Sequence, residues 1–167
     1  MDFVIRPYAP ADYDWVLECE VELQEHERAI HDTRGPALPH THDYLAMLWE
    51  ELAEGHGIML IAEDAQGVRL GLVAGHIVDS PWPMETREST RHGYVSDIFI
   101  KPEARGTGLA QALLDAIAAH FHTADPTLTR LRVNVLAVNA IARRSYEKAG
   151  FTPYEVMYER LIRPAKP

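Results

Sequence analysis

Two glycines and a threonine follow shortly after an apolar run of this sequence, in the stretch Arg105-Gly106-Thr107-Gly108-Leu109-Ala110. Glycine has no Cβ, so the backbone N–H groups of such a loop can approach phosphate oxygens closely. A helix that begins there adds the positive end of its dipole. Arg105 adds a guanidinium that can pair with phosphate. The stretch predicts a pyrophosphate-binding loop; the alternative is a tight turn that only starts a helix.

A second motif covers residues 139–151, which read N-x-x-A-x-x-x-Y-x-K-x-G-F. Gly150 suits the position just after the end of a helix, and Phe151 suits the apolar residue that follows it. The motif therefore predicts a helix that begins at Asn139 and carries Tyr146. The alternative for Tyr146 is an aromatic side chain that only packs on a sheet.

Asp97 lies inside the apolar run 94–100, whose β-branched and aromatic residues favour a strand. Alternation along a strand places Asp97 on one face with Val95 and Phe99, so we expect burial to raise the pKa of its carboxyl. Asp97 is then a candidate proton acceptor. The alternative is an aspartate that hydrogen-bonds backbone at a strand bulge or only orients a substrate.

Hydrophobic periodicity predicts the elements that position these residues. Helices are expected over residues 11–28, 43–54, 110–121 and 139–149. Strands are expected over residues 1–6, 57–64, 68–78, 94–100, 131–136 and 154–161. Glycine and proline mark the loops between them, including the stretch 79–91.

The two motifs, in this order, resemble those of the GCN5-related N-acetyltransferase (GNAT) family, whose acetyl-CoA signature reads R-x-x-G-x-G/A. The succession of predicted elements resembles the family's topology over essentially the whole chain. The resemblance implies an α/β (α+β) fold. Its twisted, mixed, mostly antiparallel sheet is flanked by helices and contains a splayed central strand pair. It also implies that residues 1–167 form a single acetyltransferase domain.

The resemblance further implies the residues that bind acetyl-CoA. They are the backbone of Ile98, Phe99 and Ile100 for the pantetheine arm, the loop of Arg105, Gly106, Thr107, Gly108, Leu109 and Ala110 for the pyrophosphate, and Asn139 for a hydrogen bond to the arm. Tyr146 is expected near the sulfur, as the general acid that protonates the leaving thiolate. A phenol with a pKa of about 10 keeps its proton at neutral pH and can serve in this way.

The activity implied by the resemblance is transfer of acetyl from acetyl-CoA to a primary amine by direct attack in a ternary complex. Keeping a lysine-like amine with a pKa of about 10.4 neutral at pH 7 costs about 4.6 kcal/mol, so a base is expected. Asp97 is the first candidate. Relatives that acetylate polyamines often carry a glutamate just before this aspartate, where this chain has Ser96, so Glu20, Glu22, Glu25 and His26 stay open as alternatives.

Candidate contacts to the acceptor come from the first helix, from the loop 79–91 and from the motif strand. They are Glu22, Glu25, His26, Trp82 and Asp97. A solvated acidic helix face, and loop packing for Trp82, are the alternatives. Among the histidines, His31, His40 and His42 lack the spacing that completes a metal site, so no metal is expected.

The composition narrows the classes of partner. A formal net charge of -9 argues against nucleic acid and favours a cationic acceptor. The sequence contains no long apolar run and no export signal, so we expect no membrane partner. The single cysteine, Cys19, suits a reducing cytoplasm, and it lies outside both motifs, which argues against a covalent thiol intermediate. Two alternatives stay open: a homodimer, and a non-catalytic acyl-CoA-binding regulatory module with the same fold.

Overall fold

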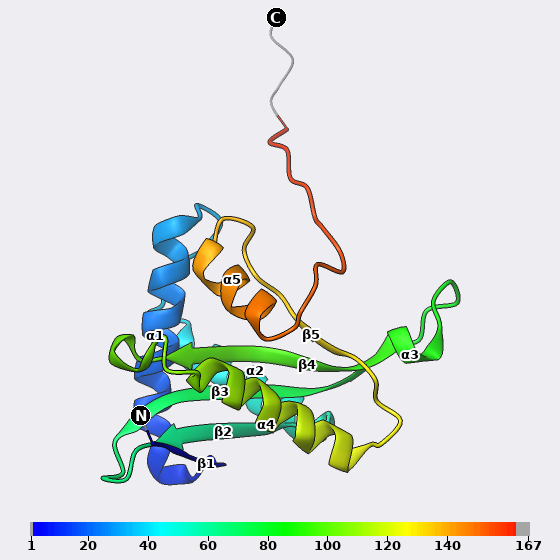
Figure 1. The fold of residues 1–167 in the computed structure, drawn as a ribbon. Coiled ribbons are helices and arrows are strands. Elements are labelled where there is room, and N and C mark those ends of the chain that lie inside the picture. Colours follow the sequence, from blue (N-terminus) through cyan, green and yellow to red (C-terminus); the bar gives the residue numbers. More distant parts are fainter. Residues whose placement is uncertain (1, 163–167) are drawn as a thin grey trace, which may run out of the picture.

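The computed structural model describes residues 2–162, which form one five-stranded sheet with helices on both faces (Figure 1). The strands lie in the order β1-β2-β3-β4-β5. Their bounds are Val4–Pro7 (β1), Ile58–Glu63 (β2), Arg69–Asp79 (β3), Arg91–Ile100 (β4) and Leu131–Val133 (β5). Neighbours are antiparallel except β4 and β5, which are parallel. The predicted mixed, mostly antiparallel sheet is confirmed.

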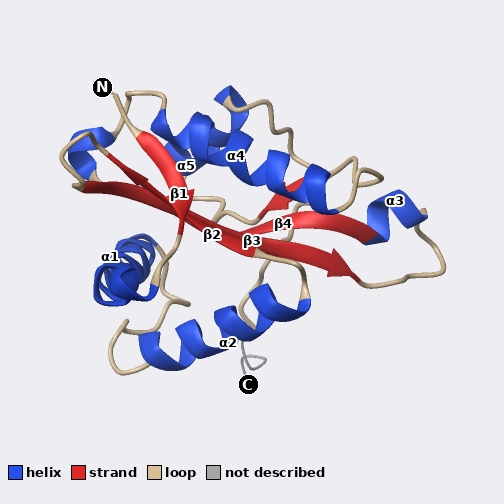
Figure 2. Ribbon diagram, turned by 90° about the horizontal axis from the view of Figure 1, so that it is seen from below, coloured by secondary structure: helices blue, strands red, loops and turns tan. Residues whose placement is uncertain are grey.

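Five α-helices accompany the sheet. Their bounds are Tyr13–Ile30 (α1), Thr41–Glu54 (α2), Arg87–Thr90 (α3), Leu109–Ala124 (α4) and Ala140–Lys148 (α5). Figure 2 shows α1 and α2 on one face of the sheet and α4 with α5 on the other. Within residues 2–162, each helix is too short or too polar to cross a membrane.

Each face of the sheet is covered by its own apolar layer. On one face, α4 buries a stripe at helical spacing that includes Leu113, Ile117 and Phe121. On the other face, Val16 of α1 and Leu45 of α2 are fully buried in a second layer. Side chains alternate between the two faces along the central strands, so one apolar layer packs against each face of the same sheet.

Asp12 ties the start of α1 to the sheet. It is 1% exposed and accepts hydrogen bonds from Arg6 of β1 and Arg69 of β3, each at 2.7 Å. The Arg6 guanidinium holds the pKa of this carboxyl well below its usual range, although burial opposes the effect. Because a buried charge needs such partners, this pairing fixes where α1 crosses the sheet, and α1 carries part of the pocket described below.

A β-bulge at Ser96 changes which side chains of β4 share a face. Ala74 lies opposite Asp97 and Gly75 lies opposite Val95, which leaves Ser96 as an extra residue on β4. Val95 therefore packs in the α4 layer, whereas Phe99 packs in the layer under α1 and α2. The expectation that Asp97 shares its face with both residues is wrong for Val95, because one inserted residue reverses the alternation.

Strand β4 and the edge strand β5 diverge after a short pairing. Their register runs from Gly93 opposite Leu131 to Val95 opposite Val133. Among the described residues, β4 has no strand beside it on the β5 side beyond Val95, so the edge from Ser96 to Ile100 is open. This is the splayed pair expected from the sequence, and the open edge offers backbone hydrogen-bonding groups to a ligand.

The last predicted strand, over residues 154–161, is wrong. Residues 151–162 contain neither helix nor strand, and Figure 1 shows this segment leaving the body of the protein. Tyr154 touches the body, because the Arg132 guanidinium of β5 lies 4.0 Å from the centre of its ring. An alternating pattern alone does not make a strand, since a strand also needs a neighbour with which to pair.

Candidate functional site

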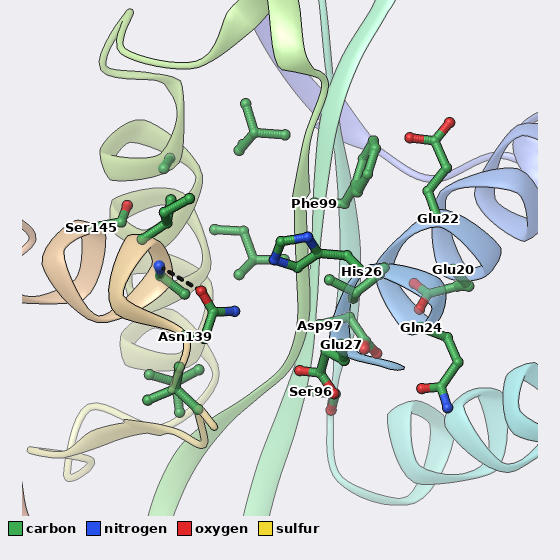
Figure 3. Close-up of a pocket in the computed structure, with 18 of the residues that line it drawn as sticks. Glu20, Glu22, Gln24, His26, Glu27, Ser96, Asp97, Phe99, Asn139 and Ser145 are labelled. Atoms are coloured by element: carbon green, nitrogen blue, oxygen red, sulfur yellow. Dashed lines mark hydrogen bonds between the residues drawn. The ribbon is translucent and has the colours of Figure 1, made fainter. Parts of the chain in front are cut away.

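A pocket of about 1480 Å³ opens where β4 and β5 diverge (Figure 3). One wall is formed by α1, by the loop after it and by the start of α2. The opposite wall is formed by the glycine loop, the first turn of α4 and the start of α5. The open half of β4 forms the floor between them. The pocket therefore brings the two sequence motifs and Asp97 to one place, although Tyr146 lies 49 positions after Asp97 in the chain.

The glycine loop has the geometry that an anion needs. Gly106 and Gly108 have φ angles of 77° and 89°, in the left-handed region that favours glycine. A Cβ on either residue would meet no atom within 4 Å, so the space beside the loop is free. No side chain caps the N-terminus of α4 at Gly108, which leaves the first N–H groups of that helix available. These features fit a bound pyrophosphate.

Arg105 and Thr107 have different positions in this loop. Arg105 lines the pocket, and its Nε donates to the Ile100 carbonyl at 3.1 Å, which holds the guanidinium between strand and loop. The Thr107 hydroxyl donates to the Ala104 carbonyl at 2.7 Å. Thr107 thus stabilises the turn, and its side chain lies outside the pocket lining.

Asn139 and Tyr146 face the pocket from α5. The Asn139 Oδ1 accepts from the Ala142 N–H at 3.1 Å and so caps the helix, as the dashed line in Figure 3 marks. Its amide nitrogen can still donate to a ligand. Tyr146 packs on Phe151, with ring centres 5.8 Å apart. Burial, followed by the charges of Glu27 and Asp97, raises the pKa of the Tyr146 phenol to about 12, so it is a proton donor at neutral pH.

Asp97 is a buried carboxyl held by Tyr44. It is 8% exposed, and the Tyr44 hydroxyl donates to its Oδ2 at 2.5 Å. Burial raises the pKa of Asp97 to about 6, against the effect of the Tyr44 hydrogen bond. Asp97 can therefore accept a proton near neutral pH, as the sequence analysis expected of a buried carboxyl.

Tyr44 is a pocket residue that the sequence analysis missed. It belongs to α2, outside both motifs, and it lies 53 positions from Asp97 along the chain. No local pattern marks such a contact. A signal could have come only from the position of Tyr44 on the predicted second helix, beside the face that turns toward the strands.

The predicted acceptor contacts do not all lie together. Glu22, Glu25 and His26 of α1 line the pocket with Asp97. Glu25 is already engaged, because its carboxylate accepts from the Ala37 N–H and from Arg28, each at 2.8 Å. Trp82 lies outside the pocket, in the loop between β3 and α3, and is 60% exposed.

The histidines near this wall have other partners. His31 lies 2.8 Å from the Thr33 hydroxyl, and the Tyr13 hydroxyl lies 3.1 Å from His42. Within residues 2–162, no group of three or more histidine, cysteine, aspartate or glutamate side chains is arranged to hold a metal ion.

A comparison with protein families decides the assignment. The model of the Acetyltransferase (GNAT) family matches residues 19–151, which include the whole of β4, the glycine loop and α5. The chain belongs to the GNAT family. The fold and the class of enzyme expected from the two motifs, a GNAT acetyltransferase, are thereby confirmed.

Two curated GNAT relatives are similar in sequence. The mycothiol acetyltransferase of Thermobispora bispora is 33% identical over 103 residues, which cover 58% of this chain but only 34% of that protein. An uncharacterised N-acetyltransferase of Schizosaccharomyces pombe is 28% identical over 120 residues, covering 72% of this chain and 67% of that protein. The chain thus spans about a third of the first relative and about two thirds of the second.

Solved structures share the GNAT fold at low sequence identity. A mutant protein from Bacillus halodurans has a TM-score of 0.79 at 19% identity, over 95% of this chain and 99% of that one. A predicted acetyltransferase of Clostridium acetobutylicum, solved with acetyl-CoA, has a TM-score of 0.72 at 19% identity, over 96% of each chain. An aminoglycoside 6′-N-acetyltransferase of Acinetobacter baumannii has a TM-score of 0.67 at 17% identity, over 98% and 100%. These likenesses concern the fold.

Proposed function

We propose that this chain transfers the acetyl group of acetyl-CoA to a primary amine by direct attack in a ternary complex. One observation carries the proposal. A single pocket joins a phosphate-type glycine loop and an open strand edge to a buried carboxyl, Asp97, and a partly buried phenol, Tyr146. The glycine loop and the strand edge fit a donor with a pyrophosphate and a long amide-containing arm. Asp97 and Tyr146 fit proton transfer at an amine.

The donor is held mainly by backbone. The N–H groups of the glycine loop and of the first turn of α4 bind the pyrophosphate, and Arg105 adds a cation at the rim. The open edge at Ile98, Phe99 and Ile100 pairs with the amides of the pantetheine arm, which then lies beside β4 as a short extra strand. Asn139 donates its amide N–H to the arm. This arrangement directs the thioester towards Tyr146 and Asp97.

Asp97 and Tyr146 move the protons of the reaction. Asp97 takes one proton from the acceptor's ammonium, which frees the nitrogen lone pair to attack the thioester carbon. A C–N bond forms and the C–S bond breaks, while a backbone N–H near Ile98 stabilises the charge on the carbonyl oxygen. Tyr146 gives its proton to the leaving thiolate and regains one from the new amide nitrogen. Asp97 returns its proton to solvent, so each turnover releases one proton.

The character of the pocket supports a cationic acceptor. The chain carries a formal charge of -9, and α1 contributes Glu20, Glu22 and Glu27 to the acceptor wall. Negative potential at a pocket mouth attracts cations and disfavours nucleic acid. Cys19 is a buried free thiol whose pKa is raised by burial, which suits a reducing cytoplasm and no role in transfer.

Release of free coenzyme A thiol from acetyl-CoA tests this function. We expect release that depends on one class of acceptor in a panel of polyamines, aminoglycosides, amino acids and peptide N-termini, with kcat/KM at least about tenfold higher for that class than for the others. Acetyl-CoA that binds without acceptor-dependent release by any amine would contradict the proposal and favour the non-catalytic acyl-CoA-binding module.

We also propose that the protein forms a homodimer through the segment 151–162. The apolar side chains of this segment are strongly exposed, with Met157 94% and Tyr158 92% exposed. Exposed apolar surface of this kind is typical of a protein interface. β5 lies at the edge of the sheet, next to the point where Tyr154 stacks on Arg132, and so offers a surface to a second copy.

Light scattering coupled to size-exclusion chromatography tests the dimer. We expect the mass of two chains for the wild type and of one chain for Met157→Lys, because a charge at this position opposes burial. Met84→Lys is the matched control, since Met84 is 84% exposed in the loop before α3 and should leave the mass unchanged. A wild-type mass of one chain would overturn the proposal.

A further inference from the structure

Glu20 is a buried carboxyl with an oxygen that makes no hydrogen bond. It lies in the middle of α1, is 4% exposed, and lines the pocket. Within the described residues its Oε1 has no hydrogen-bond partner. A buried polar oxygen without a partner is costly, so an unfilled position of this kind inside a pocket points to a group that a ligand supplies.

The groups that interact with the Glu20 and Asp97 carboxyls are acidic or phenolic, although His26, Arg34 and His40 also line the pocket. Asp97 of β4 interacts with Glu20 electrostatically, and Tyr44 of α2 donates to Asp97. Figure 3 shows the Glu20 and Asp97 carboxyls on the same side of the pocket. The charges of Glu27 of α1 and Glu51 of α2 act on Asp97, and the charge of Asp97 in turn raises the pKa of the Tyr94 and Tyr146 phenols.

In residues 2–162, neither Glu20 nor Asp97 forms a salt bridge with an arginine or lysine. Two other carboxylates of this wall have a cationic partner, since Glu25 pairs with Arg28 and Glu27 pairs with Arg34. Burial, and then the charge of Asp97, raise the pKa of Glu20 well above its ordinary value. Two carboxyls that are coupled in this way hold one proton between them over a range of pH.

We propose that Glu20 and Asp97 form a carboxyl pair that binds the acceptor's ammonium, with the unpartnered Glu20 Oε1 accepting one of its N–H groups. The inference rests on the proposed function and narrows its substrate class to alkylammonium acceptors. The ammonium takes the place of the shared proton, which leaves to solvent as the substrate binds. Asp97 then removes a proton from the bound nitrogen, while the charge of Glu20 remains as the counter-ion. Tyr44 is a positioning residue, because it acts through Asp97.

This mechanism gives Glu20 an effect on acceptor binding rather than on chemistry. We expect Glu20→Gln to raise the KM of the best panel amine at least about tenfold and to change kcat much less, because Asp97 is still present as base. The KM of the wild type should fall as pH rises, since protons compete with the ammonium for the pair. That dependence should be lost in Glu20→Gln and kept in Glu20→Asp.

The matched control is Glu18→Gln, which removes a carboxylate from the exposed face of the same helix and should leave KM unchanged. Acetyl-CoA affinity should be equal in all variants. If the wild type turns over and Glu20→Gln has the same KM and pH profile, the proposed role of Glu20 in acceptor binding is overturned. Absence of turnover in the wild type would instead contradict the proposed function itself.

Proton release on amine binding can be measured in the wild type, so this test does not require any variant to fold. Calorimetric titration of wild type with the same amine, in two buffers of different ionisation enthalpy, should show about one proton released per amine bound near neutral pH. Amine binding without proton release would overturn the shared-proton pair even if Glu20→Gln failed to fold.

Discussion

Replacing Gly108 with glutamate is expected to abolish acetyl-CoA binding, with Kd raised at least about hundredfold and the fold retained. The φ of Gly108 is 89°, and a Cβ there would enter the open space beside the loop, where the pyrophosphate is proposed to lie. The added side chain fills that space and places a negative charge next to phosphate oxygens. It also faces the N–H groups at the start of α4 and competes with the ligand for them.

Gly67→Glu is the matched control for this variant. Gly67 has a φ of 79° and an equally open Cβ position, but it lies in the turn between β2 and β3, away from the pocket. Both variants carry the same backbone strain of about 1 to 2 kcal/mol. Titration calorimetry with acetyl-CoA, alongside circular dichroism, separates strain from loss of the site. A folded Gly108→Glu protein with unaltered Kd would remove the glycine loop from the donor site.

The glycine loop and α5 could be predicted from sequence because their signals are local. A left-handed backbone at Gly106 and Gly108 requires a residue type that can be read directly from the chain. The helix that begins at Asn139 carries its own cap, and Gly150 has the positive φ expected after a helix. Such features depend on neighbours in the sequence, so spacing alone identifies them.

The acceptor side of the pocket depends on contacts that no local pattern encodes. The bulge at Ser96 is defined by the register with β3, and it decides that Asp97 faces α2 and Tyr44. The burial of Glu20 also depends on non-local contacts. Its neighbours in the sequence resemble an exposed acidic helix, but its side chain lies in the interior. Sequence reasoning could name Glu20 as one of several alternatives, and only packing distinguishes it.

In the segment 154–161, by contrast, the sequence predicts a strand that the structure does not contain. The alternating residues of this segment favour a strand, but pairing is a property of two segments, and this segment meets the sheet through a side chain, where the Tyr154 ring lies against Arg132 of β5. Trp82 is a related case, since an exposed loop position removes it from the pocket that its residue type suggested. In both cases the residue types permit the predicted structure or contact, but the neighbours in the fold decide whether it forms.

Replacing Tyr146 with phenylalanine is expected to lower kcat at least about hundredfold, with little change in acetyl-CoA affinity. General acids contribute about 10² to 10⁴ in rate, and the partly buried Tyr146 phenol, which faces the pocket from α5, is the general acid that we propose. The variant keeps the ring and its packing on Phe151, so loss of the hydroxyl is the main change. Tyr8→Phe is the matched control, because the Tyr8 ring packs at a tilt against Trp49 and does not line this pocket.

The pH profile distinguishes an acid from a packing residue at Tyr146. Because its pKa is raised to about 12, the phenol keeps its proton across the working range and adds no falling limb below about pH 10. Asp97 must be ionised to act as base, and its raised pKa of about 6 means that kcat/KM falls as the pH drops through that value. Tyr146→Phe should keep this acidic limb while losing rate at every pH. Equal kcat in the wild type and in Tyr146→Phe would contradict the role of Tyr146 as general acid. Water would then protonate the thiolate, and Tyr146 would be a packing residue of α5.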